Sequence, residues 1–140
     1  PLPPESLRMV DILTPNEREA CVLSGATDPA DAARVLVSTG AETVVVTRGT
    51  EGAVVSRGKH VTHIPAFIVD AIDSTGAGDT FNGALACGLA EGLSIEEAVE
   101  MAAAAGALAT TGYGAQAAMP ARGDIDRLRR TGVRRMPPRG

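Results

Sequence analysis

The hydrophobic and polar positions of the chain follow two different periods. Short runs such as TVVVT at 43–47 are continuously apolar and β-branched, which is typical of a strand covered on both faces. Between such runs, apolar residues recur every three or four positions, as they do along one face of a helix. Because strands alternate with helices, the pattern predicts an α/β sandwich with a largely parallel sheet and one antiparallel hairpin.

Capping residues indicate where the helices begin. Thr14 and Glu17 have the spacing of a capping box, and so do Ser94 and Glu97. Asp28 stands as an N-cap before a proline at the first helical position. The glycines expected to end helices are Gly25, Gly40 and Gly92.

About four strands can be recognised. The first two are VDILT at 10–14 and TVVVT at 43–47, and AVVS and HVTHI flank RGK as the arms of a hairpin. Three loops follow predicted strand ends: TPNE, TRGTEG and DSTGAGD. Since ligands of open α/β sheets bind at the carboxyl ends of the strands, we expect these loops to form one site.

Composition agrees with one modest domain. The 140 residues are 44% hydrophobic but only 2% aromatic, so the core must be aliphatic. A net charge of -4 argues against nucleic acid as a partner. Residues 121–140 nevertheless hold seven arginines and two aspartates. We expect there a solvated helix end and a frayed tail.

The two cysteines, Cys21 and Cys87, match no metal or redox spacing. We expect buried free thiols in a reducing compartment. No apolar stretch is long enough to span a bilayer and no signal peptide is visible. These features predict a cytoplasmic protein without a membrane partner. The chain begins at PLPPESL without Met, and we expect it to be a piece of a longer protein.

The segment DSTGAGDTFNGA at 73–84 carries the strongest chemical signal. Gly76 and Gly78 precede the start of a predicted helix, where backbone amides lack partners and can bind an anion. Asp79 then stands beside that anion as a possible base for phosphoryl transfer. The alternative is that Asp79 or Thr80 merely caps the helix and that the glycines serve a tight turn. The pattern alone leaves both interpretations open.

Other motifs are excluded. Phe81 occupies the position of the third glycine in a dinucleotide fingerprint, and no P-loop sequence is present. His60 and His63 lie three apart on a predicted strand and therefore on opposite faces. They are poor joint metal ligands, and we expect them at the surface of the hairpin.

Four segments together resemble one family: DSTGAGDTFNGAL, TPNEREA, VVVTRGTEGAVV and GYGAQAAMP. They are similar to motifs of the ribokinase-like carbohydrate kinases, or phosphofructokinase B family. The resemblance covers roughly residues 5 to 120. It implies a three-layer α/β/α fold and ATP-dependent phosphorylation of a sugar hydroxyl, with ribose as the first candidate. Residues 1–121 would be the nucleotide-binding part, and 122–140 a short helix and an Arg-rich tail.

The resemblance also assigns roles to residues. Asp79 would be the catalytic base and contact the substrate, and the anion hole would comprise Gly76, Ala77 and Gly78 together with the Asp79 amide. The nucleotide would be lined by Asn16, Thr47, Arg48, Gly49, Thr50, Glu51, Gly52, Gly78 and Asp79. Asn16 and Glu19 match the N-x-x-E element of the family, and Glu19 would hold Mg2+ through water. Without the resemblance, Glu19 is simply an exposed helix residue.

The resemblance implies a monovalent cation, with K+ as the candidate, beside the anion hole. Its ligands would be Asp73, Thr75, Ala109, Gly112 and Gly114. Two positions depart from the family pattern. Ala118 stands where a serine is frequent near the cation, and Ala103 where a polar residue is frequent near the adenine.

Length is the largest departure, because family members are about twice as long. The missing amino-terminal half would supply the sugar-binding residues and a lid that excludes water. An alternative is therefore a nucleotide-binding fragment that does not catalyse. A further alternative is a kinase for fructose, a keto-sugar acid or a nucleoside. The partners expected of the full-length form are ATP, a small-molecule sugar and a second copy in a homodimer.

Overall fold

A computed structural model describes residues 4–114 and 119–135 of the chain. They form two compact units. The first unit comprises Pro1–Gly49 and Ala53–His63, and the second comprises Thr50–Gly52 and Ile64–Gly140. Each unit is described by itself.

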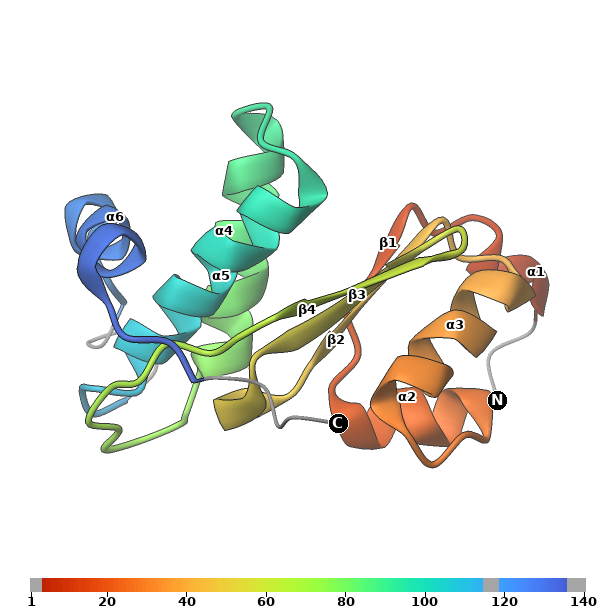
Figure 1. Ribbon diagram of the computed structural model, residues 1–140, viewed down its shortest axis with the longest axis horizontal. Helices are drawn as coiled ribbons and strands as arrows, with labels where there is room; N and C mark the ends of the chain where they lie inside the picture. Colours follow the sequence, from red (N-terminus) through yellow and green to blue (C-terminus); the bar gives the residue numbers. More distant parts are fainter. Residues whose placement is uncertain (1–3, 115–118, 136–140) are drawn as a thin grey trace. The chain divides into compact units, whose positions relative to one another are not determined.

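The first unit is built on a mixed sheet (Figure 1). Its elements are α1 (Pro4–Leu7), β1 (Ile12–Leu13), α2 (Glu17–Ser24), α3 (Pro29–Thr39), β2 (Thr43–Thr47), β3 (Ala53–Arg57) and β4 (His60–Ile64), the last residue of which belongs to the second unit. The strand order is β1-β2-β3-β4. β1 pairs with β2 in parallel, whereas β2 and β3 are antiparallel. The sheet described here is thus mixed rather than largely parallel, because only the connection through α2 and α3 returns the chain in the same direction.

Helices α2 and α3 pack together and contact the sheet through β2 and β3 (Figure 1). Leu36 of α3 belongs to the same buried apolar cluster as Val44, Val46 and Val54. All four residues of 43–46 are buried. Since neighbouring side chains of a strand point to opposite faces, both faces of β2 are covered, as its apolar run predicted.

The first predicted capping box is wrong by two residues. The N-cap of α2 is Asn16, not Thr14, and its partner is Glu19, not Glu17. Pro15 and Asn16 are still engaged with the end of β2, because the Thr47 amide donates to the Pro15 carbonyl at 2.9 Å and Asn16 forms a parallel bridge with Thr47. The helix can begin only after that pairing ends.

The other capping predictions are confirmed. Asp28 accepts hydrogen bonds from the first amides of α3, and Ser94 forms a capping box with Glu97 at the start of α5. Gly25 and Gly40 follow α2 and α3. The hairpin of β3 and β4 is present, and both histidines on β4 are exposed as expected.

The second unit is helical. Its helices are α4 (Ala77–Ala90), α5 (Ile95–Ala109) and α6 (Arg122–Thr131), and the short 3-10 turn η1 (Gly49–Glu51) contributes its last two residues. α4 and α5 lie side by side (Figure 1). A side chain at Gly88 would approach the Ala98 Cβ to 3.2 Å, so small residues allow this close contact. α6 packs on α5 through Ile125, which is buried with Met101 and Phe67.

Over the part that the structure describes, the arginine-rich segment is largely exposed to solvent, as expected, but several of its arginines also pair with acidic residues of the second unit. Arg122 pairs with Glu91, and both Arg129 and Arg134 pair with Glu100. Arg135 pairs with Glu51. Residues 122–135 are therefore bound to the rest of the second unit by charge as well as by apolar packing. The expected tail at 136–140 lies outside the described residues.

The cysteines also differ from expectation. Cys21 is half-buried and Cys87 is exposed, and both are free thiols. The Cys87 thiol donates a hydrogen bond to Glu91 at 3.4 Å. Among the helices described, none is long and apolar enough to cross a membrane.

Candidate functional site

The residues that the sequence assigns to the site are divided between the two units. The first unit holds Asn16, Glu19, Thr47, Arg48 and Gly49. The second unit holds Thr50, Glu51, Gly52, Asp73, Thr75, Gly76, Ala77, Gly78, Asp79, Ala109, Gly112 and Gly114.

The start of α4 is left without a side-chain cap. Its N-cap is Gly76, whose φ of 77° lies in the left-handed region that favours glycine. The Ala77 amide donates to the Ser74 carbonyl at 3.2 Å. Within the described segments, the amides of Gly78 and Asp79 have no hydrogen-bond acceptor. Two of the predicted anion-hole donors are thus free, while that of Ala77 is already used in a turn.

Asp79 lies in the first turn of α4, and its side chain is exposed. It has no hydrogen-bond or ion-pair partner in the part of the chain that the structure describes. Thr80, the other candidate for a cap, is buried. Because no side chain caps this helix, the structure excludes the capping interpretation of Asp79 and Thr80. The carboxylate is free to accept a proton from a substrate.

Asp73 organises the loop before α4. Its Oδ1 accepts hydrogen bonds from the amide and the hydroxyl of Thr75, at 2.9 and 2.7 Å. Its Oδ2 accepts one from the Gly114 amide at 3.1 Å. The Thr75 hydroxyl, followed by the Thr75 and Gly114 amides, lowers the pKa of the Asp73 carboxyl below its ordinary value of 3.8. A carboxylate held in its charged form suits a place beside a cation.

The predicted cation ligands meet around this loop. The amides of Ile72 and Asp73 both donate to the Thr110 carbonyl, at 2.6 and 3.0 Å, which brings the loop to the end of α5. Within the described residues, the Ala109 carbonyl at that helix end accepts no hydrogen bond outside the helix. A helix carboxyl end carries negative partial charge. Asp73, Thr75, Ala109 and Gly114 therefore fit a monovalent cation, while Ala118 lies outside the described residues.

In the first unit, the N-x-x-E element and the end of β2 lie together. Asn16 bridges to Thr47, so TPNE and the start of TRGTEG meet at one edge of the sheet, as predicted. The next residue, Arg48, pairs with Glu17 at 2.9 Å. This ion pair joins the loop after β2 to the first turn of α2.

Asn16 and Glu19 cap each other. The Glu19 amide donates to Asn16 Oδ1 at 2.9 Å, and the Asn16 amide donates to Glu19 Oε2 at 3.0 Å. Both residues are exposed and line an open hollow of about 590 Å³. Glu19 keeps one carboxylate oxygen free of these bonds. Within the described residues no three acidic, histidine or cysteine side chains could jointly hold a metal ion. Glu19 is therefore not part of a direct ligand set of such side chains in the described residues, and its contact with Mg2+ through water stays a prediction.

The loop predicted to line the nucleotide continues in the second unit at 50–52. Gly52 has a φ of 92°, and a Cβ there would lie 2.0 Å from the Ile64 carbonyl oxygen. Only glycine fits this contact. The neighbouring Glu51 points its carboxylate to Arg135 at 3.1 Å. No local sequence signal links these two residues, which are 84 positions apart.

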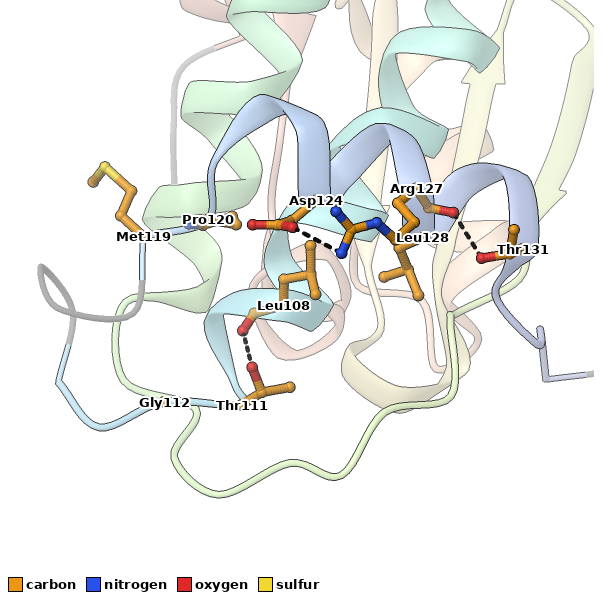
Figure 2. A pocket seen from close by; sticks show the side chains of 9 residues that line it. All are labelled: Leu108, Thr111, Gly112, Met119, Pro120, Asp124, Arg127, Leu128 and Thr131. Carbon is orange, nitrogen blue, oxygen red and sulfur yellow. Dashed lines mark hydrogen bonds and ion pairs between the residues drawn. The ribbon is translucent and has the colours of Figure 1, made fainter.

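A second hollow, of about 420 Å³, lies between the end of α5 and α6. Figure 2 shows Leu108 and Leu128 in its lining, with an ion pair between Asp124 and Arg127. Gly112 is the one predicted site residue among those that line it. The hollow is therefore separate from the start of α4.

A model of the pfkB family carbohydrate kinases matches residues 3–122. The ribokinase of Bacillus subtilis is 38% identical over 133 residues, which cover 91% of this chain and 42% of that protein. The ribokinase of Haemophilus influenzae is 44% identical over 124 residues, which cover 84% of this chain and 40% of that protein.

Solved structures agree. The ribokinase of Thermotoga maritima has a TM-score of 0.87 at 37% identity, covering 93% of this chain and 46% of that one. Arabidopsis thaliana ribokinase, complexed with ribose and ATP, has a TM-score of 0.83 at 36% identity, covering 94% of this chain and 44% of that one. The predicted ribokinase-like fold is confirmed as a partial one, because the chain spans less than half the length of these relatives. The chain belongs to the pfkB family of carbohydrate kinases.

Proposed function

We propose that this chain is the nucleotide-binding part of an ATP-dependent sugar kinase, and that the acceptor is a hydroxyl of ribose. The chain's similarity to ribokinases supports the choice of sugar. Relatives also include a deoxyribokinase, a fructokinase and a cytidine kinase, at 34% to 40% identity. The reaction class is common to all of these names, and ribose is the finer part of the proposal.

One observation carries the proposal: the start of α4 combines free backbone amides with an exposed, unpaired carboxylate among the described residues. The amides of Gly78 and Asp79 would stabilise negative charge on the phosphoryl group during transfer. The Asp79 carboxylate would take the proton from the sugar hydroxyl as its oxygen attacks the γ-phosphorus. The bond from that phosphorus to the β-γ bridging oxygen then breaks, and ADP leaves.

The remaining residues would bind and orient the nucleotide. Thr47 to Gly52 would line it, and Arg48 is fixed for this by its ion pair with Glu17. Mg2+, when bound through water near Glu19, would neutralise charge on the phosphates. Asp73 and the carbonyls at the end of α5 would hold a monovalent cation that keeps the loop before Gly76 in place.

The test supplies the part of a ribokinase that this chain does not cover. The chain is fused behind the amino-terminal segment of the Bacillus subtilis ribokinase, and phosphorylation of ribose is followed with MgATP. The chain alone, assayed in parallel, is the control. We expect turnover from the fusion and none from the chain alone, because no lid would exclude water there.

The second candidate function is nucleotide binding without catalysis. A folded fusion that binds MgATP but phosphorylates no ribose would support this candidate and contradict the first. A chain that binds no MgATP would contradict both. A cytoplasmic location and a homodimeric full-length form belong to the same proposal.

A further inference from the structure

The carboxyl-terminal end of the second unit reaches the nucleotide loop. The segment 132–135, here called the strap, follows α6 and lies beyond the residues that the family model matches, which end at 122. It pairs with residues 66–68 as a short antiparallel bridge. The Ile68 amide donates to the Val133 carbonyl, and the Arg135 amide donates to the Ala66 carbonyl, both at 2.8 Å.

Arg134 anchors the strap to the helices. Its guanidinium donates to Glu100 of α5 at 2.6 Å. It also lies over the ring of Phe67, 4.7 Å from the centroid, where a cation–π interaction adds to the ion pair. Phe67 itself is buried in the cluster that joins α5 and α6. The strap is thereby held at both its backbone and its side chains.

The same segment that pairs with the strap also supports the nucleotide loop. Gly52 lies so close to Ile64 and Ala66 that a Cβ would reach 2.7 Å from the Ala66 amide nitrogen. The Ala66 amide nitrogen thus lies against Gly52, while the Ala66 carbonyl accepts a hydrogen bond from the Arg135 amide. The Arg135 guanidinium completes the connection by donating to Glu51 Oε1 at 3.1 Å.

We propose that Arg135 is a positioning residue, which fixes the turn at 50–52 for the nucleotide through Glu51. The Glu51 carboxylate is engaged with Arg135, and through this pair it would hold the backbone of the turn that lines the nucleotide. This inference rests on the proposed function, because that function places the nucleotide at this turn. The pair is partly exposed, at 50% for Arg135 and 37% for Glu51, so its effect on the turn is modest.

The experiment uses three variants of the chain: Arg135→Glu, Glu51→Arg and the double exchange. Arg127→Glu is the matched control, since it breaks a different exposed ion pair of the second unit, Arg127 with Asp124, that has no link to the turn. Hydrogen exchange at the amides of 50–52, the Kd for MgATP and the melting temperature are measured for each.

We expect each single exchange to speed hydrogen exchange at the turn and to raise the Kd for MgATP about three- to five-fold. The double exchange should restore both to within about twofold, since the opposite charges are again paired. The control should change neither. A purely structural role would instead lower the melting temperature without a selective change at the turn.

Unchanged exchange and affinity in Arg135→Glu would overturn the inference, and so would a double exchange that restores neither. Failure of the proposed function looks different. A wild-type chain that binds no MgATP, with faster exchange at 50–52 in Arg135→Glu, would overturn the proposed function and leave only a restraint on the turn.

Discussion

Helices α2, α4 and α5 differ in how the backbone amides of their first turns are satisfied. α2 and α5 satisfy their first amides with capping boxes, Asn16 with Glu19 and Ser94 with Glu97. α4 begins at Gly76 with no side-chain cap at all. A cap stabilises a helix by about 1 kcal/mol, and the chain has the residues to provide one elsewhere. The free amides of α4 agree with the proposed anion site, although α6 also begins without a side-chain cap.

The three helices also differ in what the acidic side chain of the first turn contacts. Glu19 and Glu97 turn back toward their own N-caps and accept backbone hydrogen bonds there. Asp79 is also in a first turn, yet it accepts none within the described residues. The two capped starts bind their own carboxylates, whereas at the start of α4 the Gly78 and Asp79 amides and the Asp79 carboxylate have no partner among the described residues.

The largest effect expected from this difference is on catalysis. In the fusion with the Bacillus subtilis segment, Asp79→Asn should lower kcat by about 10²- to 10⁴-fold, because an amide cannot take the proton of the sugar hydroxyl. The Kd for MgATP should change by less than about threefold, since the amides of the helix start remain. Steady-state kinetics and calorimetry measure the two quantities.

Asp124→Asn is the matched control, because Asp124 also lies in the first turn of an uncapped helix, α6. It should leave kcat unchanged. If Asp79→Asn kept kcat within tenfold of the parent, Asp79 would not be the base and the comparison of helix starts would lose its functional meaning.

The next effect concerns the backbone of the same turn. Gly76 and Gly25 have nearly the same left-handed geometry, with φ of 77° and 76°. Alanine should therefore cost about 1–2 kcal/mol at either position, measured by urea unfolding. Only Gly76→Ala should also raise the Kd for MgATP, by about tenfold, because the strain disturbs amides that bind a charged group. Equal affinities in the two variants would show that the start of α4 binds no phosphate.

Local chemistry in the sequence was enough to predict much of the fold. The caps at Asp28 and Ser94, the buried run 43–46 and the hairpin all depend on neighbouring residues. The start of α2 was misplaced, because the pairing of Asn16 with Thr47 is a long-range contact that outweighs the local signal of Thr14. The pairing of the arginines at 122–135 was missed for the same reason. Their acidic partners, Glu91, Glu100 and Glu51, are distant in sequence.

The site was predictable where a motif concentrates its residues in one turn. The sequence suggested an anion site before α4 but could not decide between that and a cap, since both use the same residue types. The start of α4 has no side-chain cap, which removes the capping alternative, and the anion site stays a proposal. The link from Asp73 to Gly114 came only from the family resemblance, and the link from Glu51 to Arg135 came from no sequence signal.

The smallest expected effect is on the pH dependence of stability, and it tests the capping box at the start of α5. The Ser94 amide and hydroxyl hold the pKa of the Glu97 carboxyl below its ordinary value of 4.5. A lowered pKa in the folded state stabilises the protein above that value, and the contribution is lost as the pH falls below it and through the folded pKa. Glu97→Gln should therefore be less stable than the parent at pH 7, and the difference in urea midpoint should shrink as the pH is lowered below 4.5. Glu96→Gln, also in the first turn but outside the capping box, should show no such convergence. A gap between Glu97→Gln and the parent that stayed constant with pH would mean that the charge of Glu97 does not stabilise the start of α5.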